Sequence, residues 1–140
     1  MIIVDSSVWI EAARRDGDLA VKVGLEGVLE EYEAALCGPV KLEVLGAAKR
    51  SARAVLEHYF QAIPYFAIRE RHYDWAVRSS WKLRDAGLSV PWNDILIASF
   101  ALEAGCRAYA KDKHFELMRP ILGLKLYIPD YGGKFRPETS

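Results

Sequence analysis

The sequence predicts a three-layer α/β domain with a mainly parallel central sheet. Short apolar, β-branched runs alternate with longer segments of helical periodicity, which is the pattern of strands connected by helices. The first run, Ile2 to Val4, is apolar at every position, as expected of a strand buried on both faces. With 140 residues, 51% of them hydrophobic, the chain is long enough for one domain, which we place at residues 1–130, with a tail at 131–140.

In the first half of the chain, three predicted strands alternate with four predicted helices. The expected strands are residues 2–4, 34–37 and 63–68. The expected helices begin at Ser6 or Ser7 as the N-cap, run from Leu19 to about Glu33, begin again at Pro39, and span residues 51–61. Pro39 suits the first position of its helix because proline has no N–H to lose there. Pro64 cannot donate to a sheet, so the third strand is an edge strand or starts late.

The second half predicts two long helices followed by short elements. Arg71 to Ala86 is amphipathic with helical spacing, and Gly87 can end that helix. After a loop, a nearly all-apolar helix starts at Asn93 or Asp94 and ends at Gly105, so it must lie centrally in the fold. The remaining elements are a strand at residues 107–110, a short helical turn at 115–118 and a last strand at 124–128.

Composition excludes several classes of function. Lys plus Arg and Asp plus Glu are 19 each, so no global field attracts a polyanion, and RNA or DNA needs local patches. Cys37 and Cys106 lie in apolar stretches rather than in a disulfide framework, which favours a reducing cytosol. No apolar run is long enough to cross a bilayer, and no Gly-rich phosphate loop is present. We therefore expect a soluble, cytoplasmic protein without a targeting segment.

Four acidic residues are predicted to meet at one edge of the sheet. Asp5 directly follows the first strand and Asp112 the fourth, and ligands of α/β sheets bind beyond these carboxyl ends. Glu43 interrupts an apolar helix face, and Asp94 opens the apolar helix. Such a cluster repels itself and raises its own pKa values unless divalent cations bind it. An oxygen-only ligand set favours Mg²⁺ or Mn²⁺ over Zn²⁺.

Each acid also has a purely structural explanation, which its position alone leaves open. Taken singly, Asp5 is explained by a helix cap, and Asp112 by a solvated turn. Glu43 faces water if its helix is rotated, and Asp94 competes with Asn93 to cap the apolar helix. The joint placement of the four acids is what favours a site.

Four segments resemble the motifs of one family. The opening Ile2 to Ile10, read as IIVDSSVWI, resembles the start of a PIN-domain ribonuclease, in particular the toxin of a VapBC-type toxin-antitoxin pair. Pro39 to Gly46, which contains Glu43, resembles the second acidic motif of the family. Pro91 to Ala98 resembles the third motif, and Ala110 to Phe115 the fourth. The likeness extends over almost the whole chain up to the last predicted strand.

The resemblance implies a metal-dependent endoribonuclease that acts as the toxin of the pair. Its implied ligands for one or two Mg²⁺ or Mn²⁺ ions are Asp5, Glu43, Asp94 and Asp112. The hydroxyl of Ser6 would lie beside a metal-bound water. The resemblance also implies a homodimer and a small antitoxin that blocks the site. One departure is Ala110, where the family often has Thr or Ser; we expect altered metal affinity or rate rather than loss of the site.

Single-stranded or looped RNA is the expected substrate, because its bases can be splayed and stacked. Trp92 is the tryptophan best placed to stack on a base. Candidate basic residues at the rim are Lys111, Lys113, Arg14, Arg15 and Lys41.

Two other classes remain open. One is a PIN-like RNA-binding or scaffold module with weak or no cleavage, for which Ala110 is the only hint. The other is a phosphorelay receiver, which expects adjacent acids after the first strand, whereas Asp5 is followed by Ser6 and Ser7.

Overall fold

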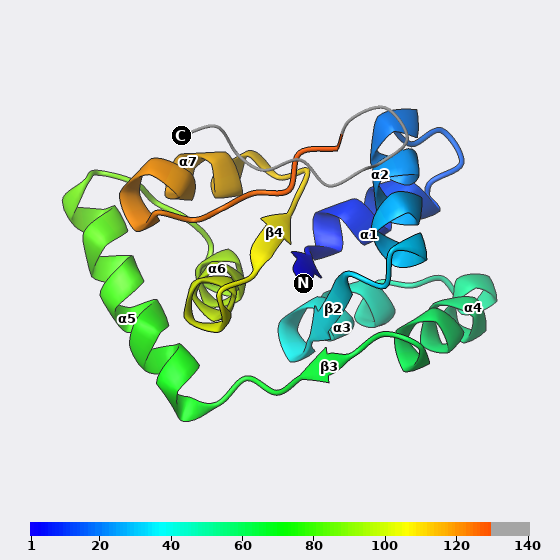
Figure 1. Ribbon diagram of the computed structural model, residues 1–140, viewed down its shortest axis with the longest axis horizontal. Coiled ribbons are helices and arrows are strands. Elements are labelled where there is room, and N and C mark those ends of the chain that lie inside the picture. Colours follow the sequence, from blue (N-terminus) through cyan, green and yellow to red (C-terminus); the bar gives the residue numbers. More distant parts are fainter. Residues whose placement is uncertain (130–140) are drawn as a thin grey trace.

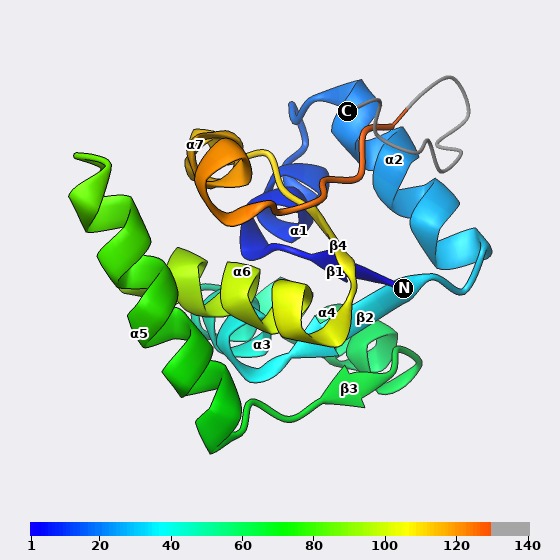
Figure 2. The same cartoon turned by 60° about the vertical axis from the view of Figure 1, so that its left-hand side comes forward.

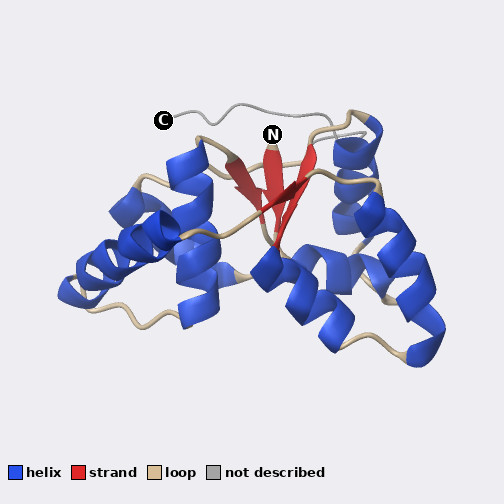
Figure 3. Ribbon diagram, turned by 90° about the horizontal axis from the view of Figure 1, so that it is seen from below, coloured by secondary structure: helices blue, strands red, loops and turns tan. Residues whose placement is uncertain are grey.

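A four-stranded parallel sheet lies at the centre of the protein, and helices lie on both sides of it (Figure 3). The computed structural model describes residues 1–129, so the predicted tail at 131–140 lies outside the described residues. The strands are β1 (Ile2–Val4), β2 (Ala34–Cys37), β3 (Tyr65–Phe66) and β4 (Arg107–Tyr109), in the spatial order β3-β2-β1-β4. This arrangement confirms the predicted α/β class with a parallel sheet.

Register explains why the first two strands are apolar throughout. Ile2 and Ile3 of β1 pair with β2 on one side and with β4 on the other. Every residue of β1 and β2 is buried, because neighbouring strands flank β1 and helices cover the sheet. A central strand of this kind has no polar face to present to water.

Seven helices connect and cover the strands within residues 1–129. They are α1 (Ser6–Ala13), α2 (Leu19–Glu30), α3 (Gly38–Gly46), α4 (Arg50–Gln61), α5 (Glu70–Asp85), α6 (Trp92–Ala104) and α7 (Lys113–Leu122). In Figure 1, α5, α6 and α7 lie to one side of the strands, and α1, α2 and α4 to the other. Figure 2 shows α5 running beside α6, against which it packs closely. The core residues Ile95, Ile97 and Ala98 confirm that α6 is central.

Three elements differ from their predicted extents. The last predicted strand is wrong: within the described residues, 124–128 form one parallel bridge, between Leu126 and Ala108. The Ala108 N–H donates to the Lys125 carbonyl (2.9 Å) and the Tyr127 N–H to the Ala108 carbonyl (2.8 Å). The expected helical turn at 115–118 is part of the longer α7, which Asp112 caps. The third strand is reduced to Tyr65–Phe66 at the sheet edge, as Pro64 anticipated.

The strand order places a topological switch point between β1 and β4. From β1 the chain moves outward through β2 and β3, and it then returns to the opposite side of β1 to form β4. In open α/β sheets, ligands bind at such a point, beyond the carboxyl ends of the strands. Asp5 and Asp112 follow these two ends. Within the described part of the chain, no helix combines the length and apolar character that spanning a membrane requires.

Candidate active site

Asp5 is a buried carboxylate with one bonded and one free oxygen. It caps α1, and its Oδ2 accepts hydrogen bonds from the Ser7 backbone N–H (3.1 Å) and from Ser7 Oγ (2.6 Å). Ser6 and Ser7 are therefore not the caps that we predicted. The other oxygen, Oδ1, is buried and has no hydrogen-bond partner among residues 1–129. An unpartnered oxygen on a side chain only 1% exposed is costly unless a cation or a donor meets it.

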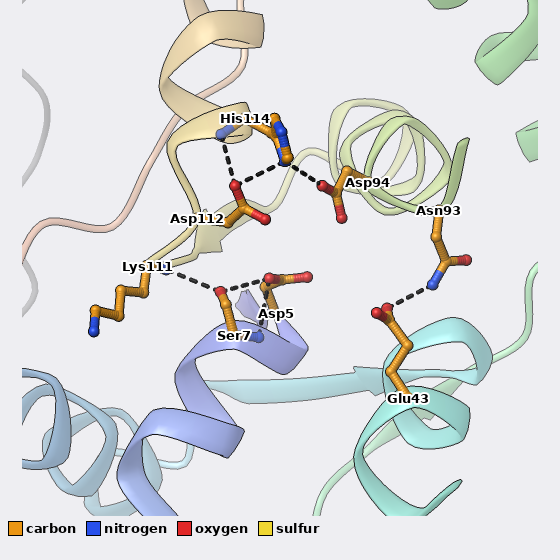
Figure 4. A network of polar contacts seen from close by, with 8 residues as sticks. All are labelled: Asp5, Ser7, Glu43, Asn93, Asp94, Lys111, Asp112 and His114. Atoms are coloured by element: carbon orange, nitrogen blue, oxygen red, sulfur yellow. Dashed lines mark hydrogen bonds and ion pairs between the residues drawn. The ribbon is translucent and has the colours of Figure 1, made fainter. Parts of the chain in front are cut away.

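Ser7 connects the first acid to the loop that carries the fourth. Its Oγ donates to Asp5 Oδ2 and accepts the Lys111 backbone N–H at 3.0 Å, so α1 and the loop after β4 are tied together (Figure 4). The Lys111 ammonium turns to Glu11 Oε1, 3.0 Å away. The site therefore has a hydroxyl that holds its first carboxylate in place.

Asp94, Asp112 and His114 form the tightest group of the site. His114 Nδ1 lies 3.0 Å from Asp94 Oδ2 and 2.8 Å from Asp112 Oδ1. The His114 backbone N–H also donates to Asp112 Oδ1 (2.9 Å), which makes Asp112 the N-cap of α7. One potential ligand atom from each residue lies within 4.8 Å of the other two. Asp94 lies in the first turn of α6 and does not cap it, since Pro91 is the N-cap.

Glu43 reaches the site from α3, on the other side of β1. Asn93 Nδ2 donates to Glu43 Oε1 at 2.5 Å, which joins α3 to the start of α6 (Figure 4). Burial raises the pKa of Glu43, and hydrogen bonds from the side chains of Asn93 and Ser6 oppose that rise. Glu43 is therefore not rotated toward bulk water, and Asn93 is occupied by Glu43 rather than by capping.

The four carboxylates are coupled electrostatically. Burial raises the pKa of Asp94 to about 6, the charges of Asp5 and Asp112 contribute to the rise, and His114 opposes the shift. Burial is also the main cause that raises the pKa of Glu43, followed by the charge of Asp5. Burial raises the pKa of Asp5, while the hydrogen bonds from Ser7 oppose it. The ionised cluster is thus unfavourable without a counter-charge.

The structure brings together the four acids that the sequence singled out, with Ser6 beside Glu43. Three polar partners were missed as members of the site: Ser7, Asn93 and His114. The signal in each case was adjacency to an acidic motif, since each lies within two residues of one of the acids. Adjacency alone could not show which way these side chains point.

The donor set fits a divalent cation. Carboxylate oxygens converge on one space from the end of β1, α3, α6 and the start of α7 (Figure 4). The unpartnered Asp5 Oδ1 and the raised pKa of Asp94 both favour a positive charge in this space, which a hard cation bound by oxygen would supply.

A parallel α/β sheet with a cluster of carboxylates at its carboxyl edge defines a class of protein, and comparison with known families identifies that class. The family model described as PIN domain matches residues 2–119 of this chain. Among curated proteins, ribonuclease VapC11 of Mycobacterium tuberculosis is 31% identical over 130 residues, which cover 89% of this chain and 96% of the relative. VapC ribonuclease Mb1587 of Mycobacterium bovis matches with the same identity and coverage. The chain belongs to the PIN-domain family and, within it, to the VapC ribonucleases.

Solved structures show the same fold at lower identity. VapBC2 from Rickettsia felis bound to a promoter DNA fragment superposes with a TM-score of 0.73 at 18% identity, covering 90% of this chain and 97% of the other. FitAcB from Neisseria gonorrhoeae gives a TM-score of 0.72 at 16% identity, covering 91% and 97%.

Proposed function

We propose that this ribonuclease is a metal-dependent endoribonuclease and the toxin of a toxin-antitoxin pair. Its metal ligands are Asp5, Glu43, Asp94 and Asp112, and its ion is Mg²⁺ or Mn²⁺. The observation that supports the metal site best is the buried, unpartnered Asp5 Oδ1 within a cluster of carboxylates that raise one another's pKa values. The 31% identity to the VapC ribonucleases supports RNA as the substrate.

Different residues of the chain have different roles in the proposed hydrolysis. A bound divalent ion would lower the pKa of a water molecule and neutralise charge that develops on the phosphate. Asp5 and Asp94 bring buried carboxylates to the ion, and Ser7 and His114 hold two of the carboxylates in place. With such an ion bound, the site would need no histidine as a general base. We expect the missing hydroxyl at Ala110 to alter metal affinity or rate rather than the ligand set.

The surroundings of the cluster suit single-stranded or looped RNA. Trp92 is 75% exposed and, together with Trp81 and His114, lines a groove between α5 and the start of α6. An exposed indole in a groove that His114 also lines offers a face for an unpaired base. Lys113 and Arg15 are exposed and able to meet phosphates, whereas Lys111 is paired with Glu11.

The proposed partners rest on the relatives. Two solved structures with the fold of this chain are VapBC2, bound to a promoter DNA fragment, and FitAcB. From membership of the VapC ribonucleases we propose a small antitoxin that covers the acidic site, a homodimer of this chain, and a cytoplasmic location, where RNA is available.

A cleavage assay tests the function and separates it from the scaffold alternative. Purified protein is stripped with chelator and incubated with end-labelled single-stranded RNA, with and without Mg²⁺ or Mn²⁺. We expect cleavage only with added metal. RNA that is bound but left intact at every metal concentration would instead favour a binding or scaffold module.

Replacing Ser7 by alanine tests the link between Asp5 and the β4–α7 loop. We expect Ser7→Ala to lower metal affinity and cleavage rate by roughly 10- to 100-fold, the range typical of groups that orient metal ligands. The physical reason is that Asp5 Oδ2 loses its 2.6 Å donor and the Lys111 N–H loses its acceptor. Calorimetric titration with Mn²⁺ and the cleavage assay measure the two effects.

Ser51→Ala is the matched control, because this serine is exposed on α4, which contributes no residue to the acidic cluster or to the groove. It should change neither quantity. Equal metal affinity in Ser7→Ala and wild type would show that the hydroxyl does not hold the ligand.

A further inference from the structure

An imidazole lies between two of the carboxylates, where an all-oxygen ligand set has no need of one. His114 Nδ1 is 3.0 Å from Asp94 Oδ2 and 2.8 Å from Asp112 Oδ1. The His114 side chain is 26% exposed, so burial does not force the ring into this position. Its backbone is anchored, because its N–H donates to Asp112 Oδ1 at 2.9 Å. The ring is therefore presented to the cluster from a fixed helix start.

We propose that His114 is a nitrogen ligand of the metal ion, beside Asp94 and Asp112. This inference rests on the proposed function, in which the acidic cluster binds a divalent ion. It changes the nature of the site from purely oxygen to mixed oxygen and nitrogen. The expected consequence is a preference for Mn²⁺, Co²⁺ and similar transition ions over Mg²⁺, since imidazole suits transition ions whereas Mg²⁺ is held by oxygen.

The spacing of the three ligand atoms fits a coordination sphere. Two ligand atoms at right angles on an ion with bonds of about 2.1 Å are about 3.0 Å apart. The two contacts of His114 Nδ1 with carboxylate oxygens have this length, at 3.0 and 2.8 Å. One ligand atom from each of the three residues lies within 4.8 Å of the others. An ion can thus be bound with small side-chain movements, and the imidazole does not have to leave.

A second observation points to a ligand in the same space. Asp5 comes from the end of β1, on a different element from His114, and its buried Oδ1 has no partner among the described residues. In Figure 4 the Asp5 carboxylate faces the space between Asp94, Asp112 and Glu43. An ion in this space would contact Asp5 Oδ1 and would connect Asp5 with Asp94, Asp112 and His114.

Pulsed electron paramagnetic resonance of the Mn²⁺-loaded wild-type protein is the direct test. We expect a coupling between the ion and ¹⁴N, which an oxygen-only site does not produce. The coupling should disappear in His114→Asn and remain in His58→Asn, since His58 is exposed on α4. Mn²⁺ that binds without nitrogen coupling in the wild type would overturn the proposal, and this measurement does not depend on the folding of any variant.

Calorimetric titration of the apo protein with Co²⁺ and Mg²⁺ gives an independent readout. In His114→Asn both affinities should fall, because two carboxylates lose their contact with the imidazole, and we expect the Co²⁺ affinity to fall by about 10-fold more than the Mg²⁺ affinity because only Co²⁺ also loses a favoured nitrogen ligand. Equal losses for both ions would show that His114 acts only as a hydrogen-bond partner of the carboxylates. The underlying metal site fails separately, if Asp94→Asn binds both ions and cleaves RNA as the wild type does.

Discussion

Asp94→Asn is expected to lower the rate of metal-dependent RNA cleavage by more than about 100-fold. Losing a residue that only orients a metal ligand typically costs 10- to 100-fold, and losing a ligand itself should cost more. The change replaces an ionised oxygen by a neutral amide of the same shape. Asn can still accept a hydrogen bond from His114, which is 3.0 Å from Asp94 Oδ2 in the wild type. The local packing at the start of α6 is therefore kept while the charge is lost. Cleavage of labelled RNA across Mn²⁺ concentrations measures the effect.

The same variant is expected to be at least as stable as the wild type in chelator. Ionised Asp94 lies among Asp5 and Asp112, whose charges raise its pKa, so its removal relieves repulsion in the metal-free protein. Thermal unfolding followed by circular dichroism measures this. Asp74→Asn, at an exposed position of α5, is the matched control and should change neither activity nor stability. Full cleavage by a carefully purified Asp94→Asn protein would contradict the assignment of the site.

The second large effect is the dependence of stability and metal binding on pH. The pKa of Asp94 is raised from 3.8 to about 6, so the folded state holds this proton more tightly than the unfolded state. Folding stability from this group is thus greatest in acid and is lost as the pH rises from about 4 to about 6. The shift corresponds to at most roughly 3 kcal/mol at neutral pH, and solvent screening at this partly open site reduces it. Bound metal reverses the effect, because it favours the ionised form.

Comparing wild type with Asp94→Asn isolates this contribution from the other acids. In chelator at pH 8, the variant should be more stable by up to roughly 3 kcal/mol, and the difference should vanish near pH 4. Mn²⁺ should stabilise the wild type at pH 8 and much less at pH 5, where Asp94 is protonated. Unfolding curves from pH 4 to 8, with and without Mn²⁺, provide the measurement. A constant difference between the two proteins at all pH values would show that Asp94 does not titrate in this range.

Local patterns were sufficient for much of the fold. β1 and β2 were predictable because central parallel strands are apolar at every position, and α5 and α6 because their apolar spacing or content is unmistakable. The failure at residues 124–128 has a physical cause. An apolar run becomes a strand only if a neighbouring strand forms a ladder of hydrogen bonds with it, and within residues 1–129 this segment forms one bridge, to Ala108.

The candidate site, too, was predictable in part from the sequence. Asp5 and Asp112 could be placed at one edge from the sequence, because the carboxyl ends of parallel strands share an edge. The structural explanation of both acids as helix caps is compatible with the proposed role in metal binding. Asp5 caps α1 with one oxygen and leaves the other free, and Asp112 caps α7 while it contacts His114. Capping therefore never excluded a role in metal binding.

The amino-acid sequence alone predicted the α/β class, the family resemblance and the four acids of the candidate site. These predictions were possible because they depend on short-range periodicity and on motifs. Only the folded chain decided the contacts of Ser7 with Lys111, of Asn93 with Glu43 and of His114 with Asp94, which join residues 104, 50 and 20 positions apart. Such contacts depend on strand register and on the rotation of each helix about its axis. Local sequence patterns constrain both of these weakly, whereas close packing of the core leaves one solution.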